Sequence, residues 1–180
     1  QDITLPINNV SLSGSGTDPD GTIAAYRWRK VSGPTTFTIT NTTSATTTVT
    51  GLVQGIYRFE LRVTDNIGAT DFDTMQVTVN PAPNQAPAAN AGSNQNITLP
   101  VNSVSLNGSG TDPDGTISSY LWTKISGPTG GTITNTTSAS TSATGMLQGV
   151  YQYQLTVTDN DGATDTDIIQ VTVSQTVNQA

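Results

Sequence analysis

Two carboxylates stand two residues apart in an eight-residue stretch that the sequence contains twice. The stretch reads Gly-Ser-Gly-Thr-Asp-Pro-Asp-Gly at residues 14–21 and again at residues 108–115. Proline fixes φ and glycine permits positive φ, so the composition is that of a tight turn. The same arrangement can aim hard oxygen ligands at a calcium ion. Taken alone, the stretch leaves both a plain turn and a metal-ligand set open.

A third carboxylate ends the clearest alternating apolar run of each copy, at Asp65 and Asp159. In a seven-strand sandwich this strand lies beside the strand that follows the Asp-Pro-Asp-Gly loop, which brings the third carboxylate towards the other two. Clustered like charges raise pKa values and cost stability, and a hard cation removes that conflict. Calcium binds oxygen ligands on flexible loops in variable geometry, whereas magnesium requires a tighter octahedral arrangement of its ligands. We therefore expect calcium to be bound by two sets of carboxylates: Asp18, Asp20 and Asp65, and Asp112, Asp114 and Asp159.

The composition argues against several classes of function. The net charge is −7, whereas a nucleic-acid binder needs a basic surface. The sequence has no His and no Cys, which removes the commonest general base and the thiol nucleophile and leaves the redox compartment open. It contains no phosphate loop and no nucleophile elbow, and paired carboxylates in a turn of a small domain have no substrate cleft beside them. We expect no enzymatic activity.

The chain aligns with itself without a gap at an offset of 94 residues, and roughly two thirds of the aligned positions are identical. Each copy consists of short Thr-rich strands between turns, without helical periodicity, which predicts an all-β fold of two tandem β-sandwiches. The predicted domains are 1–80, without the first strand segment, and 87–174. A Pro-rich linker spans 81–86 and the next linker starts at 175–180. No apolar run approaches the ~20 residues of a membrane span, so this segment is not expected to insert into a membrane.

Alternation along the strands predicts which side chains face the core. Both Trp residues and the Tyr-Leu-Val face of the long strand are expected inside, with Phe37 and Phe72 as aromatic exceptions outside. Acidic residues alternate on the last strand of each copy and are expected to point outward, where they discourage edge-to-edge aggregation. These residues are Asp71, Asp73, Asp165 and Asp167.

The first copy holds nearly all of the basic residues. Its arginines fall on outward positions of two strands, and if those strands pair they form one exposed patch with Glu60. An acidic glycan or an acidic neighbouring module could bind there, although a solvated sheet face is the simpler interpretation. The patch residues are Arg27, Arg29, Arg58 and Arg62.

The order of the motifs is informative beyond any one of them. An Asn-x-x-Pro linker, then Asp-x-Asp-Gly-x-Ile-x-x-Tyr-x-Trp, then Gly-x-Tyr-x-(Phe/Tyr)-x-Leu-x-Val-x-Asp resembles the PKD (polycystic kidney disease) family. The arrangement looks closest to repeats arrayed in secreted and surface proteins of Bacteroidetes-type bacteria. The resemblance implies immunoglobulin-like sandwiches linked end to end and, in some members, calcium at the linker end. Matched by position, the family's ligands are Asp112, Asp114 and Asp159, with Asn84 and Gln85 completing the shell.

These features predict a structural and adhesive module of a long, repetitive extracellular or bacterial cell-surface protein. Calcium would stiffen the joints between repeats and make the array a spacer or fibre stalk. The expected partners are neighbouring repeats of the same chain, polysaccharide or other cell-surface material, and laterally associated copies. The alternative is a carbohydrate-binding accessory module of a secreted polysaccharide-degrading enzyme, which would need exposed aromatic side chains as a platform.

Overall fold

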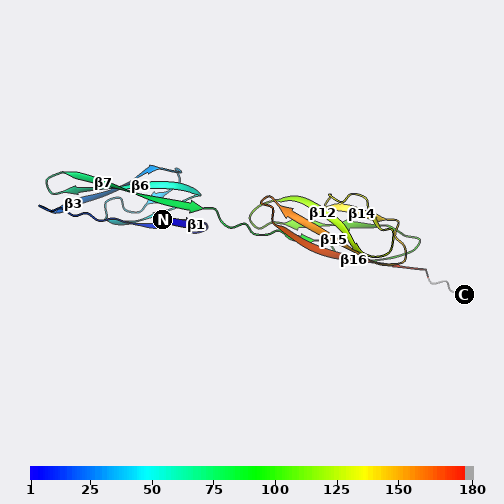
Figure 1. Ribbon diagram of the computed structural model, residues 1–180. Helices are drawn as coiled ribbons and strands as arrows, with labels where there is room; N and C mark the ends of the chain where they lie inside the picture. The colour runs from blue at the N-terminus through cyan, green and yellow to red at the C-terminus, as the bar shows by residue number, and fades with distance from the viewer. Residues whose placement is uncertain (177–180) are drawn as a thin grey trace. The chain divides into compact units, whose positions relative to one another are not determined.

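The computed structural model describes residues 1–176, which form strands, turns and loops in two compact units (Figure 1). The first unit is Gln1–Pro83 and the second begins at Asn84. The all-β prediction of two sandwich domains is confirmed. The predicted start of a further linker at 175–180 lies mostly outside the described residues, since 177–180 are not among them.

The first unit packs two sheets face to face. One sheet has the order β1-β7-β6-β3 and the other has the order β2-β5-β4. Strand β1 runs parallel to β7, and the other pairs are antiparallel. The strands are β1 (Asp2–Thr4), β2 (Val10–Ser13), β3 (Ile23–Ser32), β4 (Thr38–Ile39), β5 (Thr46–Thr50), β6 (Gly55–Asp65) and β7 (Thr70–Asn80).

The second unit repeats this arrangement and adds a further pair of strands. Its main sheets have the orders β12-β15-β16-β9 and β10-β14-β13, and β11 pairs with β8 in a small additional sheet. The strands are β8 (Ala88–Asn90), β9 (Gln95–Thr98), β10 (Val104–Asn107), β11 (Ser109–Thr111), β12 (Ile117–Ser126), β13 (Thr132–Ile133), β14 (Ser140–Thr144), β15 (Gly149–Asp159) and β16 (Thr164–Ser174).

The period-two pattern predicted the cores correctly. Trp28 and Trp122 are 3% and 1% exposed, and in each case the indole N–H donates to a backbone carbonyl, that of Ala45 or of Ala139. This bond satisfies the polar end of a ring that otherwise contributes apolar area. On β15 the whole Tyr-Leu-Val face is buried, as expected from the alternation of side chains across a strand.

The prediction for the two aromatic exceptions is half right. Phe72 is 52% exposed, but Phe37 packs edge to face on the buried Phe59 with their ring centroids 6.1 Å apart. Lys30 covers the Phe37 ring from 4.7 Å and binds the carbonyls of the turn below it. Phe37 is therefore part of the packed interior and offers no open platform.

Candidate functional site

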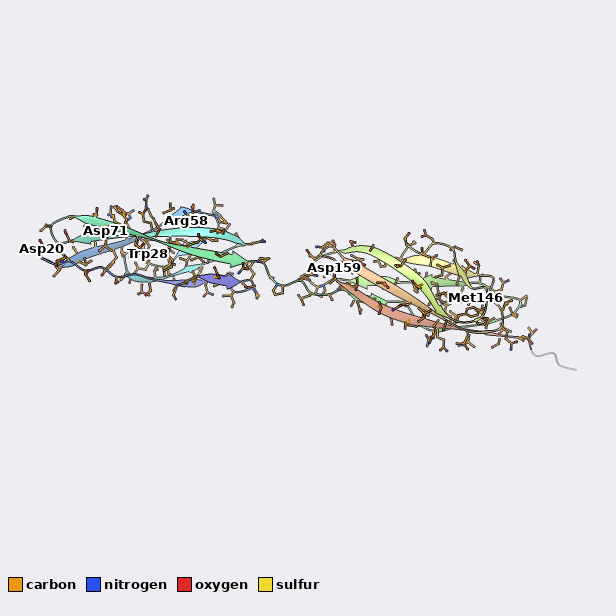
Figure 2. All side chains as sticks on the ribbon, in the orientation of Figure 1. Asp20, Trp28, Arg58, Asp71, Met146 and Asp159 are labelled. Carbon is orange, nitrogen blue, oxygen red and sulfur yellow. The ribbon has the colours of Figure 1, made fainter. Side chains whose placement is uncertain are left out.

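Asp159 ends β15 at the end of the second unit where the chain enters it (Figure 2). The residue is 1% exposed, and hydrogen bonds reach both of its carboxylate oxygens. Oδ1 accepts the N–H groups of Asp161 and Ala163 at 2.9 and 2.8 Å, and Oδ2 accepts the side-chain amide of Asn84 at 2.9 Å. The Asn84 amide, followed by these backbone N–H groups, holds the pKa of Asp159 below its usual value despite burial.

The Asp-Pro-Asp-Gly loop lies against the same entering segment. The backbone N–H of Gln85 donates to both carboxylate oxygens of Asp114, at 3.3 and 3.2 Å. Asp112 Oδ1 accepts the N–H of Asp114 at 3.2 Å, whereas Asp112 Oδ2 is buried and has no hydrogen-bond partner. A buried carboxylate oxygen without a donor is costly, so this atom is the strongest local indication that the loop can bind a cation or a water molecule.

The Asp-Pro-Asp-Gly loop of each unit requires its final glycine, but not for the positive φ that the sequence suggested. Neither Gly21 nor Gly115 has a positive φ. A Cβ on Gly115 would lie 2.2 Å from Asn160 Oδ1 and 2.6 Å from Asp112 Oδ2, and Gly21 is equally crowded. Glycine is required here because two polar side chains pack directly against its Cα.

Sequence reasoning missed Asn160 and its counterpart Asn66. Asn160 Oδ1 accepts the N–H of Thr116 at 2.7 Å, and Asn66 Oδ1 accepts that of Thr22 at 2.9 Å. Each Asn ties the end of the acidic loop to the turn after the long strand. The signal was present, because Asp-Asn recurs at this point in both copies.

The fit of this site to a cation is partial. Six Asp and a single Lys occupy residues 84–180, so the carboxylates have little cationic compensation, and the one Lys binds turn carbonyls. One observation argues against a metal site: residues 1–176 contain no group of three or more acidic side chains placed to hold one ion together. Asn84 also presents its N–H to Asp159, and an N–H cannot ligate a cation.

The first unit arranges its matching residues more openly. Asp18 and Asp65 line one depression of about 170 Å³ together with Asp71, and Asp20 is not among the residues that line it. Asp65 Oδ1 accepts the N–H groups of Ile67 and Ala69 at 2.9 and 2.8 Å, as Asp159 does in the second unit. Asp65 is partly exposed, whereas Asp159 is buried, so the two residues have in common only the hydrogen bonds of the turn that follows them.

The acidic residues of the last strand do not simply point into solvent. In the second unit Asp165 Oδ2 accepts the N–H of Ala89, and Asp167 Oδ2 accepts that of Ala91, both at 2.8 Å. The Ala89 N–H, as the leading cause, lowers the pKa of Asp165. The outward prediction is therefore wrong for Asp165 and Asp167, because the adjoining strand β8 is held by their carboxylates. Their counterparts Asp71 and Asp73 are exposed.

The basic patch forms on the outer face of β3, β6 and β7. Cross-strand pairing places Arg27 opposite Arg62, and Arg62 opposite Phe72. Arg29 binds Glu60 through two contacts of 2.7 and 3.0 Å, and this pairing lowers the pKa of Glu60. A depression of about 370 Å³ is lined by these residues, while Arg58 pairs with Ser32 farther along the strand and does not line it.

The two units thus define a class of protein, a tandem pair of β-sandwich repeats with acidic loops at one end of each. Comparison with protein families assigns that class. The model for the K319L-like PKD domain matches residues 1–79 and 91–173, so the chain belongs to this family and the PKD prediction is confirmed.

Curated proteins and a solved structure are similar to the chain. The chain is 36% identical to the human dyslexia-associated protein KIAA0319 and 39% identical to the mouse KIAA0319-like protein, in each case over 96% of this chain and 16% of the relative. The solution structure of a PKD domain from human KIAA0319 is 27% identical, covers 53% of this chain and 88% of that domain, and has a TM-score of 0.45. The chain thus spans a small part of the length of these relatives, which are mammalian proteins.

Residues 1–176 contain no helix with the length and hydrophobicity that crossing a membrane requires.

Proposed function

We propose that this chain is a structural and adhesive segment of a longer extracellular or cell-surface protein, in which PKD repeats act as spacers. Membership of the K319L-like PKD family and the tandem arrangement support this proposal. The bacterial surface array suggested by the motif order is part of the proposal, and it rests on the motifs alone because the curated relatives named above are mammalian.

Calcium binding at the entrance of the second unit is the mechanistic part of the proposal. The observation that carries it is the buried, unpartnered Asp112 Oδ2. The proposed ligands are Asp112, Asp114 and Asp159, with Asn84 added after a rotation of its amide that exchanges the N–H for its oxygen. Gln85 would position Asp114 through its backbone N–H. Because Asn84 and Gln85 follow directly on the prolines of the linker, binding would fix the end of the linker to the loops of the second unit.

A calorimetric titration of the whole chain with calcium tests this site, and a thermal melt in EDTA and in calcium measures its effect. A Kd near ~10 μM would stabilise the second unit by about 2.7 kcal/mol at ~1 mM calcium. Asp112→Asn should abolish both signals, while the matched variant Asp18→Asn in the first unit should retain binding at the second. If calcium gives no heat of binding, or if both variants lose the same amount of binding, these carboxylates are only turn residues.

Glycan binding at the basic patch is a second candidate, favoured by one observation. The exposed Phe72 ring follows Arg62 and Arg27 in a single cross-strand row, and aromatic and guanidinium groups together can hold an acidic sugar. In the second unit Thr166, Thr156 and Leu121 occupy the same row. Retention on an immobilised acidic polysaccharide that is lost in Arg62→Gln, with no retention on dextran, would support it. Unchanged retention in that variant would remove the patch from consideration.

A further inference from the structure

The basic patch contains two arginines that have no carboxylate partner. Arg27 and Arg62 stand directly opposite each other on β3 and β6, and both are exposed. The salt bridge between Arg29 and Glu60 is the one ion pair among residues 1–176, so neither of these arginines takes part in one. Side chains directly opposite each other on antiparallel strands have Cβ atoms about 4.5–5.5 Å apart, and like charges there are destabilising. The first unit therefore holds together two cations that an anion between them would stabilise.

Glu60 determines which arginines are left for a ligand. Arg29 Nε and Nη2 donate to the two carboxylate oxygens of Glu60 at 2.7 and 3.0 Å, so one guanidinium group holds one carboxylate in a two-bond fork. The Glu60 side chain is 13% exposed, whereas the Arg29 side chain is 65% exposed. The carboxylate thus lies beneath the surface and is already bound by one arginine, and Arg27 and Arg62 remain for an anion from outside.

The free pair borders a depression of about 370 Å³ whose lining includes one aromatic ring. Phe72 is 52% exposed and stands opposite Arg62 on β7, so the ring and the two guanidinium groups follow one another in a row across the sheet. An exposed aromatic ring can cover the apolar face of a sugar while the cations beside it bind a charged substituent. Glu60 is the one acidic residue of the lining, and Arg29 already holds it.

The second unit has the same strands without this patch. The five residues that line the depression are all replaced there, although roughly two thirds of the aligned positions of the repeats are identical. Strand β8 binds the carboxylates of Asp165 and Asp167 on the buried side of β16, and Thr166 on the outer side is exposed. The fold therefore does not require the ring or the charges. Leu121, Thr123, Gln154, Thr156 and Thr166 stand in the places of Arg27, Arg29, Glu60, Arg62 and Phe72.

We propose that the basic patch binds a sugar that carries a sulfate or phosphate ester in preference to a sugar that carries a carboxylate. The proposal rests on the glycan binding proposed above for this patch and names the chemical class of the anion. Such an ester has three terminal oxygens in a tetrahedral arrangement, so the guanidinium groups of Arg27 and Arg62 bind it from two sides. A carboxylate has one planar edge of two oxygens, which a single arginine fills, as Arg29 does with Glu60. Phe72 packs against the sugar ring.

Dextran derivatives that share one backbone and differ in the anion test this class directly. Dextran sulfate, dextran phosphate and carboxymethyl dextran, matched in length and in charge per sugar, are titrated into the whole chain by calorimetry at one fixed ionic strength. We expect at least one ester polymer to bind at least tenfold more tightly than the carboxymethyl polymer. The tighter of the two ester polymers identifies the ester.

Variants of equal charge separate the arginine pair from the general attraction of a basic surface. Arg27→Gln and Arg62→Gln should each weaken binding of the ester polymer at least tenfold. The matched control is Arg58→Gln, which removes the same charge farther along β6, outside the depression (Figure 2), and should change binding less than twofold. Equal weakening in all three variants would overturn the site at the arginine pair.

The remaining outcomes distinguish this inference from glycan binding itself. Equal affinity for the ester and carboxymethyl polymers would overturn the preference for an ester and leave glycan binding in place. Binding of none of the three polymers would overturn both. Self-association of the chain that Arg62→Gln abolishes would assign the patch to acidic residues of a second copy, and would also overturn both.

Discussion

The two repeats have nearly the same strand framework, yet equivalent acidic residues differ in burial and in hydrogen bonding. In the second repeat the segment entering at Asn84 buries Asp159, reaches Asp114 and continues as β8 along Asp165 and Asp167. In the first repeat the matching carboxylates border open depressions. In the second repeat these acids are therefore acceptors for a backbone segment.

Removing the central Trp tests whether the two cores are equivalent. Trp122→Ala and Trp28→Ala should each cost about 3–5 kcal/mol, because both rings are almost fully buried. Urea unfolding of each variant, followed by signals assigned to each unit, measures the two effects. Phe72→Ala, at an exposed site, should change stability by less than about 0.5 kcal/mol. A much smaller loss in Trp28→Ala would mean that the two cores are not equivalent.

Asp167→Ala and Asp73→Ala sharpen the comparison at the acceptor carboxylates. Asp167→Ala leaves the N–H of the buried Ala91 without a partner and should cost the second unit about 1–3 kcal/mol. Asp73→Ala removes a carboxylate that holds no strand and should stay within about 0.5 kcal/mol. Equal losses at the two positions in chemical denaturation would contradict the role assigned to β8.

Acid titration separates the two repeats through Asp159. Its lowered pKa means that the charged form stabilises the folded second unit. That contribution is complete above the carboxyl pKa of the unfolded chain and is lost as the pH falls through the lower pKa of the folded state. Melts between pH 7 and pH 2 should show this loss in the second unit, and Asp159→Asn should flatten it. If the variant lost stability at low pH as the parent chain does, Asp159 would not be the cause of that loss.

The smallest expected effect concerns the hydroxyl of Tyr153, which Phe59 lacks in the first repeat. Tyr153 is buried and its hydroxyl donates to the Gly131 carbonyl at 2.9 Å, whereas the first repeat has Phe59 and Phe37 at these positions. Tyr153→Phe should cost about 0.5–1.5 kcal/mol in urea unfolding. Burial raises the pKa of Tyr153 to about 12, so the second unit should lose stability as the pH rises above 10, where tyrosine ionises in the unfolded chain. Tyr153→Phe should reduce that alkaline loss, and an unaltered alkaline limb would contradict this role for burial.

Strand periodicity predicted a large part of the fold. Alternation on β6 and β15 identified the buried face, and the outward row of Arg27 and Arg62 followed from the same rule. The outward prediction for Asp165 and Asp167 followed from their charge and went against the alternation, because both share the parity of the buried Ile169. Neither charge nor periodicity carries information about a neighbouring segment whose N–H groups bind these carboxylates.

The sequence predicted which residues form the candidate site better than it predicted how they interact. The sequence named Asp112, Asp114, Asp159, Asn84 and Gln85. In the structure Asn84 bonds Asp159 and Gln85 bonds Asp114, whereas Asp112 accepts only the N–H of Asp114. The sequence did not indicate that Asn84 acts as a donor, or that Gly115 serves as a gap for two side chains. Those features depend on orientation and close packing, which residue types and spacing do not specify.

The sequence by itself determined the repeat, the all-β class, the core residues and the family, because each rests on local alternation and motif order. Only the tertiary structure decided which carboxylates accept hydrogen bonds from backbone N–H groups, and which one has an oxygen without a partner. The bonds that decide this join residues 75 and 76 positions apart in the chain. Contacts at such separations form between strands from opposite ends of a domain, so they follow from how the sheets pack and not from any local pattern.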